Sequence, residues 1–316
     1  MSELAVIGAG AWGTALALQA ARAGRNVALW ARRPERLASG ESPYLPGFPL
    51  PRAVRVVADI PAAALTLLVV PMQHLREVAC RLPAGGGLVV CAKGVELGTG
   101  MLALEVLAQA APGRTAGVLS GPNFAAEIAA GLPAASVIAS ASESLRREVD
   151  AALATPGFRL YGNDDPVGAS VGGAAKNVIA FAAGAVIGAG LGENARAALA
   201  TRGLAEMTRF AVALGGRAET VAGLSGLGDL MLSCAGPTSR NFRLGQALGK
   251  GETLAEVLAR HEFVTESVAT APALLARAKA AGCELPISAA VAGVLSGRLD
   301  VRAAMAGLLA RPRRDE

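Results

Sequence analysis

The chain has 316 residues, of which 53% are hydrophobic and 17% are charged, and its formal net charge is +5. This composition excludes an intrinsically disordered protein, and the length predicts two domains. Basic residues form no stripe with interleaved aromatics, so we expect an anionic small molecule and no nucleic acid as partner. The longest uncharged run, Leu4–Ala21, contains three glycines and favours a strand and a helix over a membrane span, so we expect a cytoplasmic protein.

The N-terminal half alternates short apolar runs with helix-forming segments, which is typical of parallel strands buried on both faces. The predicted strands are Leu4–Ile7, Val27–Trp30, Val54–Val57, Leu67–Val70, Leu88–Cys91, Ala116–Leu119, Ala135–Ile138 and Phe158–Tyr161. The predicted helices between them are Ala11–Ala23, Met72–Leu82, Met101–Ala111 and Ser142–Ala154.

After Tyr161 the pattern predicts helices only. They are Val167–Leu191, Arg196–Leu214, a helix opened by a capping box from Thr253 to Glu256, Thr265–Ala281, Ile287–Leu295 and Val301–Ala310, the last capped by Asp300. We therefore predict an α/β protein with a mainly parallel Rossmann domain at 1–164 and an all-helical substrate-binding and catalytic domain at 165–316.

The segment Gly8-Ala9-Gly10-Ala11-Trp12-Gly13 follows the first strand and opens the first helix. In a dinucleotide-binding turn, Gly8 would allow the tight turn, Gly10 the close approach of a pyrophosphate, and Gly13 the packing of the helix. The second strand ends with Arg32 and Arg33, where an NAD site often has a carboxylate. Arginines suit a 2′-phosphate, so NADP(H) is favoured and NAD(H) is possible.

Two further motifs follow strands, where open α/β sheets bind their ligands. Lys93 ends Cys91-Ala92-Lys93 and could meet an anionic substrate. The segment 120–127, Ser-Gly-Pro-Asn-Phe-Ala-Ala-Glu, has a Gly-Pro turn and then a helix that offers unpaired backbone N–H groups. Either motif is also compatible with an ordinary loop.

In the helical half, Gly172 and Gly173 precede Lys176 and Asn177, and such dense glycines indicate that a cofactor or another backbone comes close. A lysine among apolar residues suits acid–base chemistry. Asp229 lies in a glycine turn from which it could orient an amine.

The segment Thr238-Ser239-Arg240-Asn241 offers hydroxyl, guanidinium and amide donors at a helix start, with Thr238 as the predicted N-cap. These donors indicate a phosphate site.

The four cysteines, Cys80, Cys91, Cys234 and Cys283, lie far apart without metal-ligand spacing, so we expect reduced core residues and no metal. The only two histidines, His74 and His261, have no Asp or Cys at an informative spacing, which argues against a histidine acid–base group.

Taken together, the motifs GAGAWGTAL, CAKG, SGPNFAAE, GGAAKN, GLGDL and TSRN resemble bacterial-type NAD(P)-dependent glycerol-3-phosphate dehydrogenase, over nearly the whole chain. The resemblance implies reversible reduction of dihydroxyacetone phosphate to sn-glycerol 3-phosphate with NAD(P)H, for phospholipid synthesis, by a homodimer.

The resemblance also implies roles for individual residues. Lys176 would be the proton acceptor, with Asp229 as a second catalytic residue. Substrate contacts would be Lys93, Gly121, Asn123, Asn177, Asp229, Ser239, Arg240 and Asn241. Cofactor contacts would be Gly8, Gly10, Ala11, Trp12, Gly13, Arg32, Arg33, Lys93, Ala125, Arg240, Val264 and Glu266.

Two alternatives stay open. A 3-hydroxyacid or ketopantoate-type NADP-dependent reductase could share the Rossmann half and a helix lysine, but the arginine–asparagine motif at 240–241 argues against it. A non-catalytic NADP(H)-sensing module would bind cofactor without turnover, and Lys176 and Asp229 argue against that.

Overall fold

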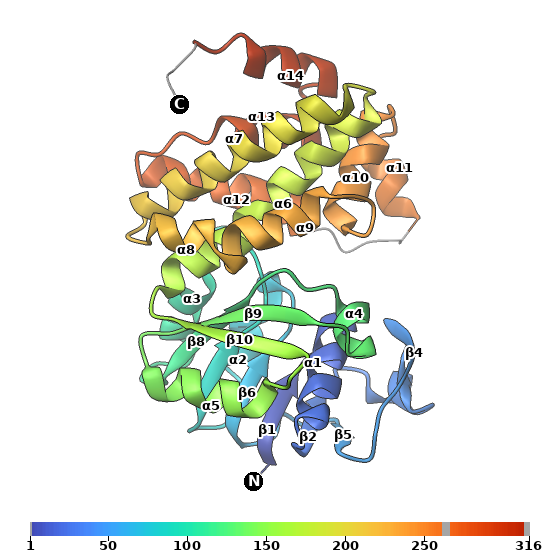
Figure 1. Ribbon diagram of the computed structural model, residues 1–316, viewed down its shortest axis with the longest axis vertical. Helices are drawn as coiled ribbons and strands as arrows, with labels where there is room; N and C mark the ends of the chain where they lie inside the picture. Colours follow the sequence, from blue (N-terminus) through green and yellow to red (C-terminus); the bar gives the residue numbers. More distant parts are fainter. Residues whose placement is uncertain (1, 261–265, 313–316) are drawn as a thin grey trace. The chain divides into compact units, whose positions relative to one another are not determined.

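The computed structural model describes residues 2–260 and 266–312. The chain divides into two compact units, an N-terminal unit of residues 1–93 and 102–170 and a C-terminal unit of residues 94–101 and 171–316. Each unit has its own elements, shown in Figure 1. The domain border predicted between residues 164 and 165 stays a prediction.

The N-terminal unit contains an eight-stranded sheet in the order β10-β9-β8-β7-β6-β1-β2-β5. All neighbours pair in parallel except β8 and β9, which are antiparallel. This confirms the predicted mainly parallel sheet. The strands are β1 (Ser2–Ile7), β2 (Val27–Trp30), β5 (Val54–Val57), β6 (Ala63–Leu68), β7 (Gly87–Val90), β8 (Ala116–Ser120), β9 (Ala134–Ala139) and β10 (Phe158–Asn163).

The sequence missed a short antiparallel pair, β3 (Glu41–Ser42) and β4 (Leu45–Pro49). β4 begins and ends near prolines and is half exposed, so it lacks the apolar run that marks the other strands. β6 begins four residues before the predicted Leu67, because Ala63 and Ala64 pair in the sheet although they are weakly apolar.

Five helices cover the sheet. α1 (Ala11–Arg22), α4 (Ala125–Ala130) and α5 (Glu143–Leu153) lie on one face, and α2 (Leu75–Ala79) and α3 (Ala103–Ala110) pack together on the other (Figure 1). The predicted helix at 72–82 is shorter than expected: a 3₁₀ turn, Met72–His74, precedes α2.

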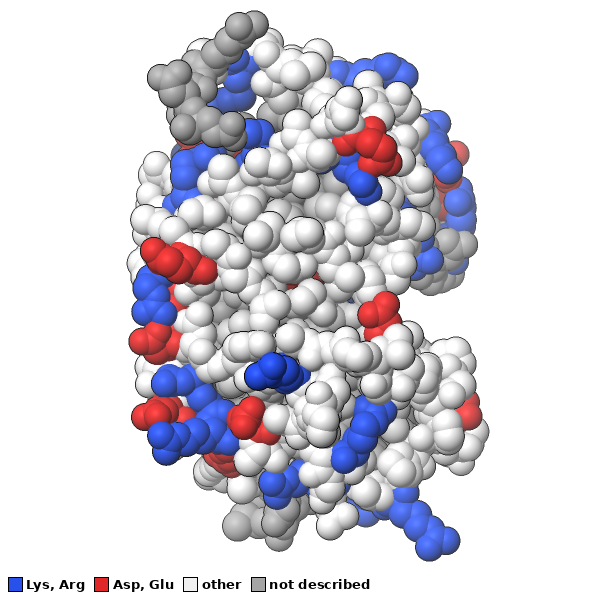
Figure 2. Space-filling model, in the orientation of Figure 1, with Lys and Arg blue, Asp and Glu red and all other residues white. Residues whose placement is uncertain are grey.

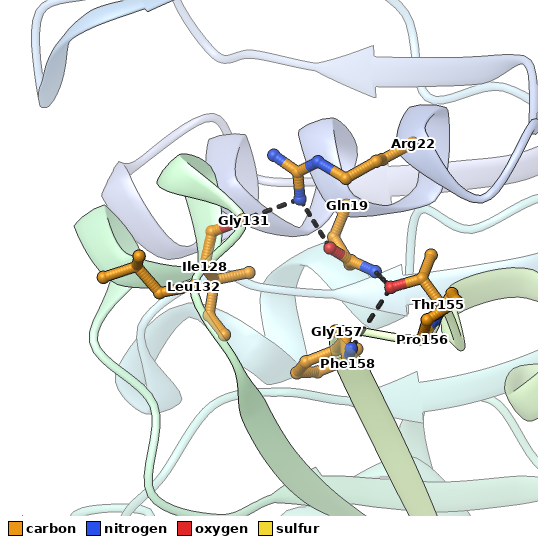
Figure 3. Close-up of a pocket in the computed structure, with 9 residues that line it drawn as sticks. All are labelled: Gln19, Arg22, Ile128, Gly131, Leu132, Thr155, Pro156, Gly157 and Phe158. Atoms are coloured by element: carbon orange, nitrogen blue, oxygen red, sulfur yellow. Dashed lines mark hydrogen bonds between the residues drawn. The ribbon is translucent and has the colours of Figure 1, made fainter.

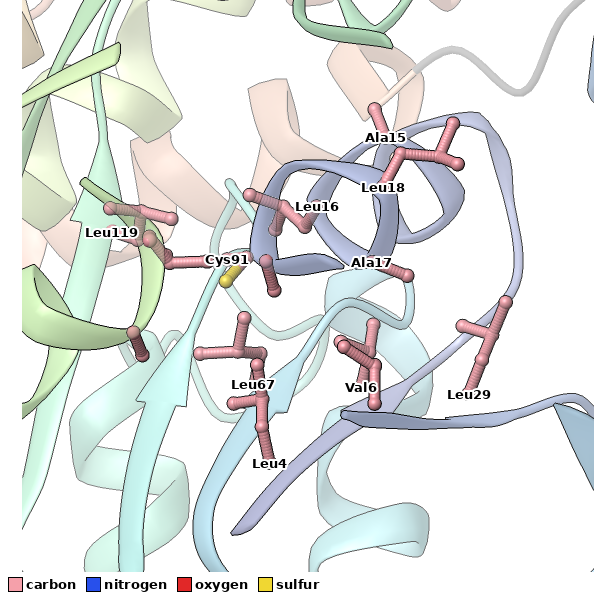
Figure 4. Packing of buried hydrophobic residues seen from close by; sticks show 14 of the residues in the cluster. Leu4, Val6, Ala15, Leu16, Ala17, Leu18, Leu29, Leu67, Cys91 and Leu119 are labelled. Atoms are coloured by element: carbon pink, nitrogen blue, oxygen red, sulfur yellow. The ribbon is translucent and has the colours of Figure 1, made fainter. Parts of the chain in front are cut away.

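Between α1 and the sheet lies a core of small aliphatic side chains. Leu16 of α1 faces Leu4 and Val6 of β1 and Leu67 of β6, and all four are at most 2% exposed (Figure 4). Complete burial of such side chains is the main stabilising term for this layer. Because β1 lies at the centre of this core, the loop that follows it has a fixed starting point.

In the C-terminal unit every described element is a helix, as predicted. The helices are α6 (Pro166–Gly188), α7 (Gly192–Ala213), α8 (Ala218–Ala222), α9 (Asp229–Cys234), α10 (Arg240–Gly249), α11 (Leu254–Ala259), α12 (Glu266–Ala280), α13 (Pro286–Leu295) and α14 (Val301–Leu309), with a π turn at Leu224–Gly228.

α6 is 23 residues long and apolar enough to cross a membrane by length and composition, with a mean hydropathy of 1.5 over its most apolar window. However, 83% of that window is buried inside the protein. Such burial is typical of the core helix of a globular unit.

α6 and α10 cross with their backbones in direct contact. A Cβ atom on Gly184 or Gly188 of α6 would overlap the carbonyls of Phe242 and Gln246, and one on Gly245 or Gly249 of α10 would overlap the carbonyls of Phe181 and Ala185. We call these four residues the glycine crossing. Gly172 likewise approaches the carbonyl of Ser225, at 2.6 Å from a built Cβ. The close approach predicted at Gly172 is therefore made by protein backbone, and the glycine crossing was not predicted.

Candidate active site

The loop between β1 and α1 has the geometry that a dinucleotide pyrophosphate requires. Gly8 has a φ of +118°, and a Cβ there would lie 2.9 Å from the carbonyl oxygen of Val69. A Cβ on Gly13 would overlap the carbonyl of Gly8, whereas nothing lies within 4 Å of the Cβ position at Gly10. Gly8 and Gly13 are thus required by the protein itself. Gly10 leaves open space where a ligand can come close, which fits a dinucleotide.

This loop lies where the strand order reverses, between β1 and β6. Ligands of open α/β sheets bind at such a point, beyond the carboxyl ends of the strands. Ala11 and Trp12 open α1, and Gly10 is its N-cap without a side-chain capping bond. The first N–H groups of the helix are therefore available to an anion.

Arg32 and Arg33 follow β2 at the same edge of the sheet, and both are exposed. Among the described residues, neither side chain forms an ion pair or hydrogen bond, although the backbone carbonyl of Arg33 accepts from the N–H of Arg36 at 3.2 Å. Trp30, at the end of β2, is anchored by Nε1, which donates to the carbonyl of Ala58 at 2.8 Å. The two guanidinium groups are thus free to bind a phosphate.

A second polar cluster lies beyond the ends of β7 and β8. Lys93 Nζ donates to the carbonyl of Gly121 at 3.2 Å, and Asn123 Nδ2 donates to Ser136 Oγ at 2.6 Å. Asn123 Oδ1 and Ser120 Oγ are buried without a hydrogen-bond partner among the residues that the structure describes. Unpaired buried acceptors are costly unless a ligand satisfies them, so this cluster fits a substrate with donor groups. Ser120 begins the predicted segment 120–127 but was not among the predicted contacts, and Ser136 was not predicted.

Gly121 is required by the same turn. Its φ is +146°, and a Cβ there would lie 3.0 Å from the Cα of Ser136. Ala125 then begins α4, whose N-cap, Phe124, makes no side-chain capping bond.

In the C-terminal unit, the lysine of α6 meets two acceptors from α9. Lys176 Nζ lies 2.8 Å from Asp229 Oδ1 and 2.8 Å from Ser233 Oγ. The Lys176 side chain is 12% exposed and that of Asp229 only 1%. The sequence singled out Lys176 and Asp229 but missed Ser233. The spacing in the sequence could have indicated Ser233, because it lies four residues after Asp229 and therefore on the same helix face.

The buried cysteines Cys91 and Cys234 have low reactivity. Burial raises the pKa of Cys234 to about 12, although the charge of Lys176 lowers it, and burial also raises the pKa of Cys91. Both thiols are therefore protonated at neutral pH and are poor nucleophiles. All four cysteines are unpaired, but the expected core placement is wrong for Cys80, which is exposed, and for Cys283, which is half-buried.

A third cluster joins α6, α10 and α12. Asn177 Nδ2 donates to Glu266 Oε2 at 2.6 Å, and Asn241 Nδ2 donates to Asn177 Oδ1 at 3.0 Å. The backbone N–H of Ser267 donates to Asn241 Oδ1 at 3.1 Å. The structure thus brings together three residues that sequence placed separately. Val264, the other predicted contact in this region, lies outside the described residues.

Ser239 and Arg240 begin α10. Ser239 is the N-cap and accepts from the N–H of Phe242 at 3.3 Å, so the predicted cap at Thr238 is wrong by one residue. Ser239 has the extended backbone that a cap residue adopts, with ψ of 123°. Arg240, the first helical residue, is exposed.

A cavity of about 250 Å³ lies elsewhere, and no predicted site residue lines it (Figure 3). There Arg22 Nη1 donates to Gln19 Oε1 at 2.6 Å, and Gln19 Nε2 donates to Thr155 Oγ1 at 3.1 Å. Because these polar groups pair with one another, the cavity gives no sign of a ligand.

No group of three or more His, Cys, Asp or Glu side chains that could hold a metal occurs within residues 2–260 and 266–312. His74 is half exposed beside Glu77, 3.9 Å away, and His261 lies outside the described residues. On the face seen in Figure 2, basic and acidic side chains are interspersed.

The Rossmann sheet, the glycine turn at its switch point and a helical unit with a buried lysine–aspartate pair define the chain as a dehydrogenase-type dinucleotide-binding protein. Family models agree. Residues 3–146 match the N-terminal model of NAD-dependent glycerol-3-phosphate dehydrogenase, and residues 165–306 match its C-terminal model. The chain belongs to this family of NAD(P)-dependent enzymes, as the sequence motifs indicated.

Individual relatives are similar over their full lengths. Glycerol-3-phosphate dehydrogenase [NAD(P)+] of Acidiphilium cryptum is 58% identical over 99% of this chain and 98% of its own, and that of Gluconobacter oxydans is 50% identical over 98% and 97%. The crystal structure of the Coxiella burnetii enzyme matches with a TM-score of 0.93 at 37% identity, covering 98% of each chain. A Ralstonia eutropha ketopantoate reductase shares the fold alone, at a TM-score of 0.58 and 19% identity.

Proposed function

We propose that this chain reduces dihydroxyacetone phosphate to sn-glycerol 3-phosphate with NAD(P)H, reversibly. The observation that carries the proposal is the buried ion pair of Lys176 and Asp229 within a chain that matches the family over both units. This reaction needs a proton donor at the carbonyl oxygen and a grip on the phosphate. The clusters described above offer both.

The bound nicotinamide supplies the hydride that reduces C2 of the substrate. Lys176 Nζ donates the proton to the oxygen on C2, or takes it back in the oxidative direction. Asp229 and Ser233 hold Nζ in place, so little reorganisation accompanies the proton transfer. Asp229 also keeps a compensating negative charge beside the lysine, because both side chains are withdrawn from water.

The phosphate of the substrate is held by the start of α10. Ser239, Arg240 and Asn241 supply a hydroxyl, a guanidinium and an amide there, and backbone N–H groups of the first turn add to them. Lys93, Gly121 and Asn123 are further substrate contacts in this proposal. The buried acceptor Asn123 Oδ1 suits a hydroxyl group.

We further infer that NADPH is the preferred cofactor. The glycine turn binds the pyrophosphate, and Arg32 and Arg33 bind the 2′-phosphate, since no described carboxylate pairs with them. Ala11, Trp12, Ala125, Val264 and Glu266 complete the cofactor contacts that we propose. Replacing the two arginines by Ser and Glu should weaken NADPH much more than NADH, as measured by fluorescence titration. An equal loss for both cofactors would contradict this preference.

The deciding experiment is NADPH oxidation with dihydroxyacetone phosphate and, in parallel, with ketopantoate. We expect much higher kcat/KM with the phosphorylated triose, because the donors of α10 match a phosphate. Turnover of ketopantoate in its place would favour the reductase alternative. Tight NADPH binding with neither substrate consumed would favour a sensing module.

We also propose a homodimer working in the cytoplasm on the supply of glycerol 3-phosphate for phospholipids. The four unpaired cysteines are consistent with a reducing compartment. Sedimentation equilibrium of the purified chain tests the dimer.

A further inference from the structure

The chain of hydrogen bonds through Asn177 and Asn241 has a polarity that its two ends dictate. At one end stands the Glu266 carboxylate, which, when ionised, can only accept; at the other stands the backbone N–H of Ser267, which can only donate. An Asn side chain can do both, and its two orientations differ only by a flip about the terminal bond. The two end groups, the Glu266 carboxylate and the Ser267 N–H, therefore fix the orientation of both amides.

Glu266 sets the direction of each hydrogen bond in turn. Because Glu266 Oε2 accepts, Asn177 must turn its Nδ2 toward α12, at 2.6 Å, and its Oδ1 away. That Oδ1 then accepts from Asn241 Nδ2 at 3.0 Å. Asn241 is left with its Oδ1 facing the Ser267 N–H, at 3.1 Å. Each bond has the only direction compatible with the one before it.

These hydrogen bonds form a ring, because they begin and end on neighbouring residues in the first turn of one helix. Glu266 and Ser267 are the first two residues of α12, whereas Asn177 belongs to α6 and Asn241 to α10. Asn177 is 2% exposed, Asn241 7% and Ser267 fully buried, whereas Glu266 is half-buried, so water has little access to the two bonds that Asn241 makes. Buried polar groups that are hydrogen-bonded to one another favour a single arrangement.

Each amide keeps one N–H that no hydrogen bond among the described residues uses. With the opposite flip, the carbonyl oxygens would take those positions and would repel a phosphate. We propose that Glu266 is a positioning residue, which orients Asn177 and Asn241 so that they offer N–H donors to the phosphate of the substrate. This inference rests on the proposed function, and it gives Glu266 a role on the substrate side in addition to the proposed cofactor contact.

The test is a double-substitution cycle between Glu266 and Asn241, for which the structure gives no direct side-chain hydrogen bond. Glu266→Ala should lower kcat/KM for dihydroxyacetone phosphate about tenfold, chiefly through KM, which is the size expected when a hydrogen bond to a charged group is lost. In an Asn241→Ala background the same change should cost a clearly smaller factor than in wild type, because one of the two oriented amides is already gone. With unphosphorylated dihydroxyacetone, and with NADPH saturating for each variant so that a lost cofactor contact is offset, the effect of Glu266→Ala should vanish.

Two variants distinguish the orienting role of Glu266 from a general effect of its negative charge. Glu266→Gln keeps an acceptor oxygen without the charge and should retain most of the efficiency, whereas a role through charge would make it as poor as Glu266→Ala. Glu219→Ala removes an exposed carboxylate from the first turn of α8 and serves as the matched control, with no change expected. Equal losses from Glu266→Ala with and without Asn241, or with and without the phosphate, would overturn the inference.

A wrong substrate can be told apart from a wrong orienting role, because the ring also couples Glu266 and Asn241 in the stability of the folded protein. The unfolding free energies of wild type, Glu266→Ala, Asn241→Ala and the double variant, from urea titrations, need no substrate. We expect the two destabilisations to be less than additive. Additive values overturn the ring whether or not the protein reduces dihydroxyacetone phosphate. If the two substitutions are coupled in stability but the protein does not reduce dihydroxyacetone phosphate, the orienting role of Glu266 holds and only the proposed substrate is refuted.

Discussion

Lys176 has two hydrogen-bond acceptors from a single neighbouring helix, α9. Lys176→Ala should lower kcat about 10²–10⁴-fold, the usual contribution of a positioned proton-transfer group. The affinity for NADPH should stay within about twofold of wild type because the glycine turn lies on other elements. Lys279→Ala, at an exposed position of α12, is the control. A normal kcat for Lys176→Ala would contradict the mechanism.

Arg240 should behave differently because we propose that it binds the phosphate of the substrate. Arg240→Ala should raise KM for dihydroxyacetone phosphate and lower kcat/KM, with a smaller fall in kcat. With dihydroxyacetone, which has no phosphate, the variant should be no worse than wild type. If the same factor is lost with both substrates, Arg240 does not bind the phosphate.

The cysteines allow a check on burial at the level of single side chains. A maleimide at pH 8 should label Cys80, which is exposed, and should leave Cys91 and Cys234 unmodified. The pKa of Cys234 is raised to about 12, so its thiolate is scarce at that pH. Peptide mass spectrometry reads the pattern. Labelling of Cys234 in the folded protein would show that α9 opens.

At the scale of elements, the glycine crossing fixes the distance between α6 and α10. Gly245→Ala should destabilise the protein by about 1–3 kcal/mol or more, because the added methyl would meet the carbonyl of Phe181, which belongs to a helix backbone. Gly307→Ala in α14, where nothing lies within 4 Å, should be neutral or stabilise by up to about 1 kcal/mol. Urea unfolding measures both. A neutral Gly245→Ala would mean that the helices can separate without cost.

Glu206 of α7 holds the start of α13 and makes stability depend on pH. Its carboxylate accepts from the N–H of Ile287 at 2.8 Å and from the N–H and hydroxyl of Ser288 at 3.0 and 2.6 Å. Burial raises the pKa of Glu206, more than these bonds and Arg209 lower it. The folded state therefore binds the proton more tightly than the unfolded state, so stability falls as the pH rises above 4.5 through the raised pKa.

Glu206→Gln cannot titrate, so it serves as the reference. The Tm of wild type minus that of Glu206→Gln should decrease between pH 4.5 and pH 7. An increase over that interval would mean that the hydrogen bonds outweigh burial.

The sequence predicted elements well where a single local signal decides them. Continuous apolar runs gave the strands of the large sheet, and the capping box at Thr253 gave the start of α11, which the structure confirms with both bonds present. The missed elements are β3, β4, α8 and α9, which are at most six residues long and too short for a clear local signal. Asp229, predicted to lie in a glycine turn, is the first residue of α9. Their positions depend on the tertiary packing around them.

The same distinction applies to the site. Motifs identified Lys176, Asp229 and Asn241, because their spacing resembles a known family. The partnership of Asn177 with Glu266 joins residues 89 apart in the chain, and that of Lys176 with Ser233 joins residues 57 apart. No local pattern encodes such distances; they arise when α6, α9, α10 and α12 pack together.

At the scale of the whole molecule, two glycines of one turn separate the proposed cofactor binding from folding. Gly10→Val should abolish NADPH binding while the protein stays folded, because its side chain would enter open space meant for pyrophosphate. Gly13→Ala should instead lower stability, since its methyl would meet the carbonyl of Gly8. Calorimetric titration and thermal unfolding separate the two results. NADPH affinity retained by Gly10→Val would refute the assignment of the loop.

The glycine crossing also limits how this enzyme could be altered to accept longer or shorter substrates. Lys176 and Asn241 stand on the two helices that it joins. In the mechanism that we propose, two backbones in contact therefore set the distance between the reacting oxygen and the phosphate. Substitutions among the four glycines cannot tune that span gradually, because even one methyl group meets a carbonyl. A change of substrate length must instead come from side chains around the crossing or from an enzyme with a different pair of helices.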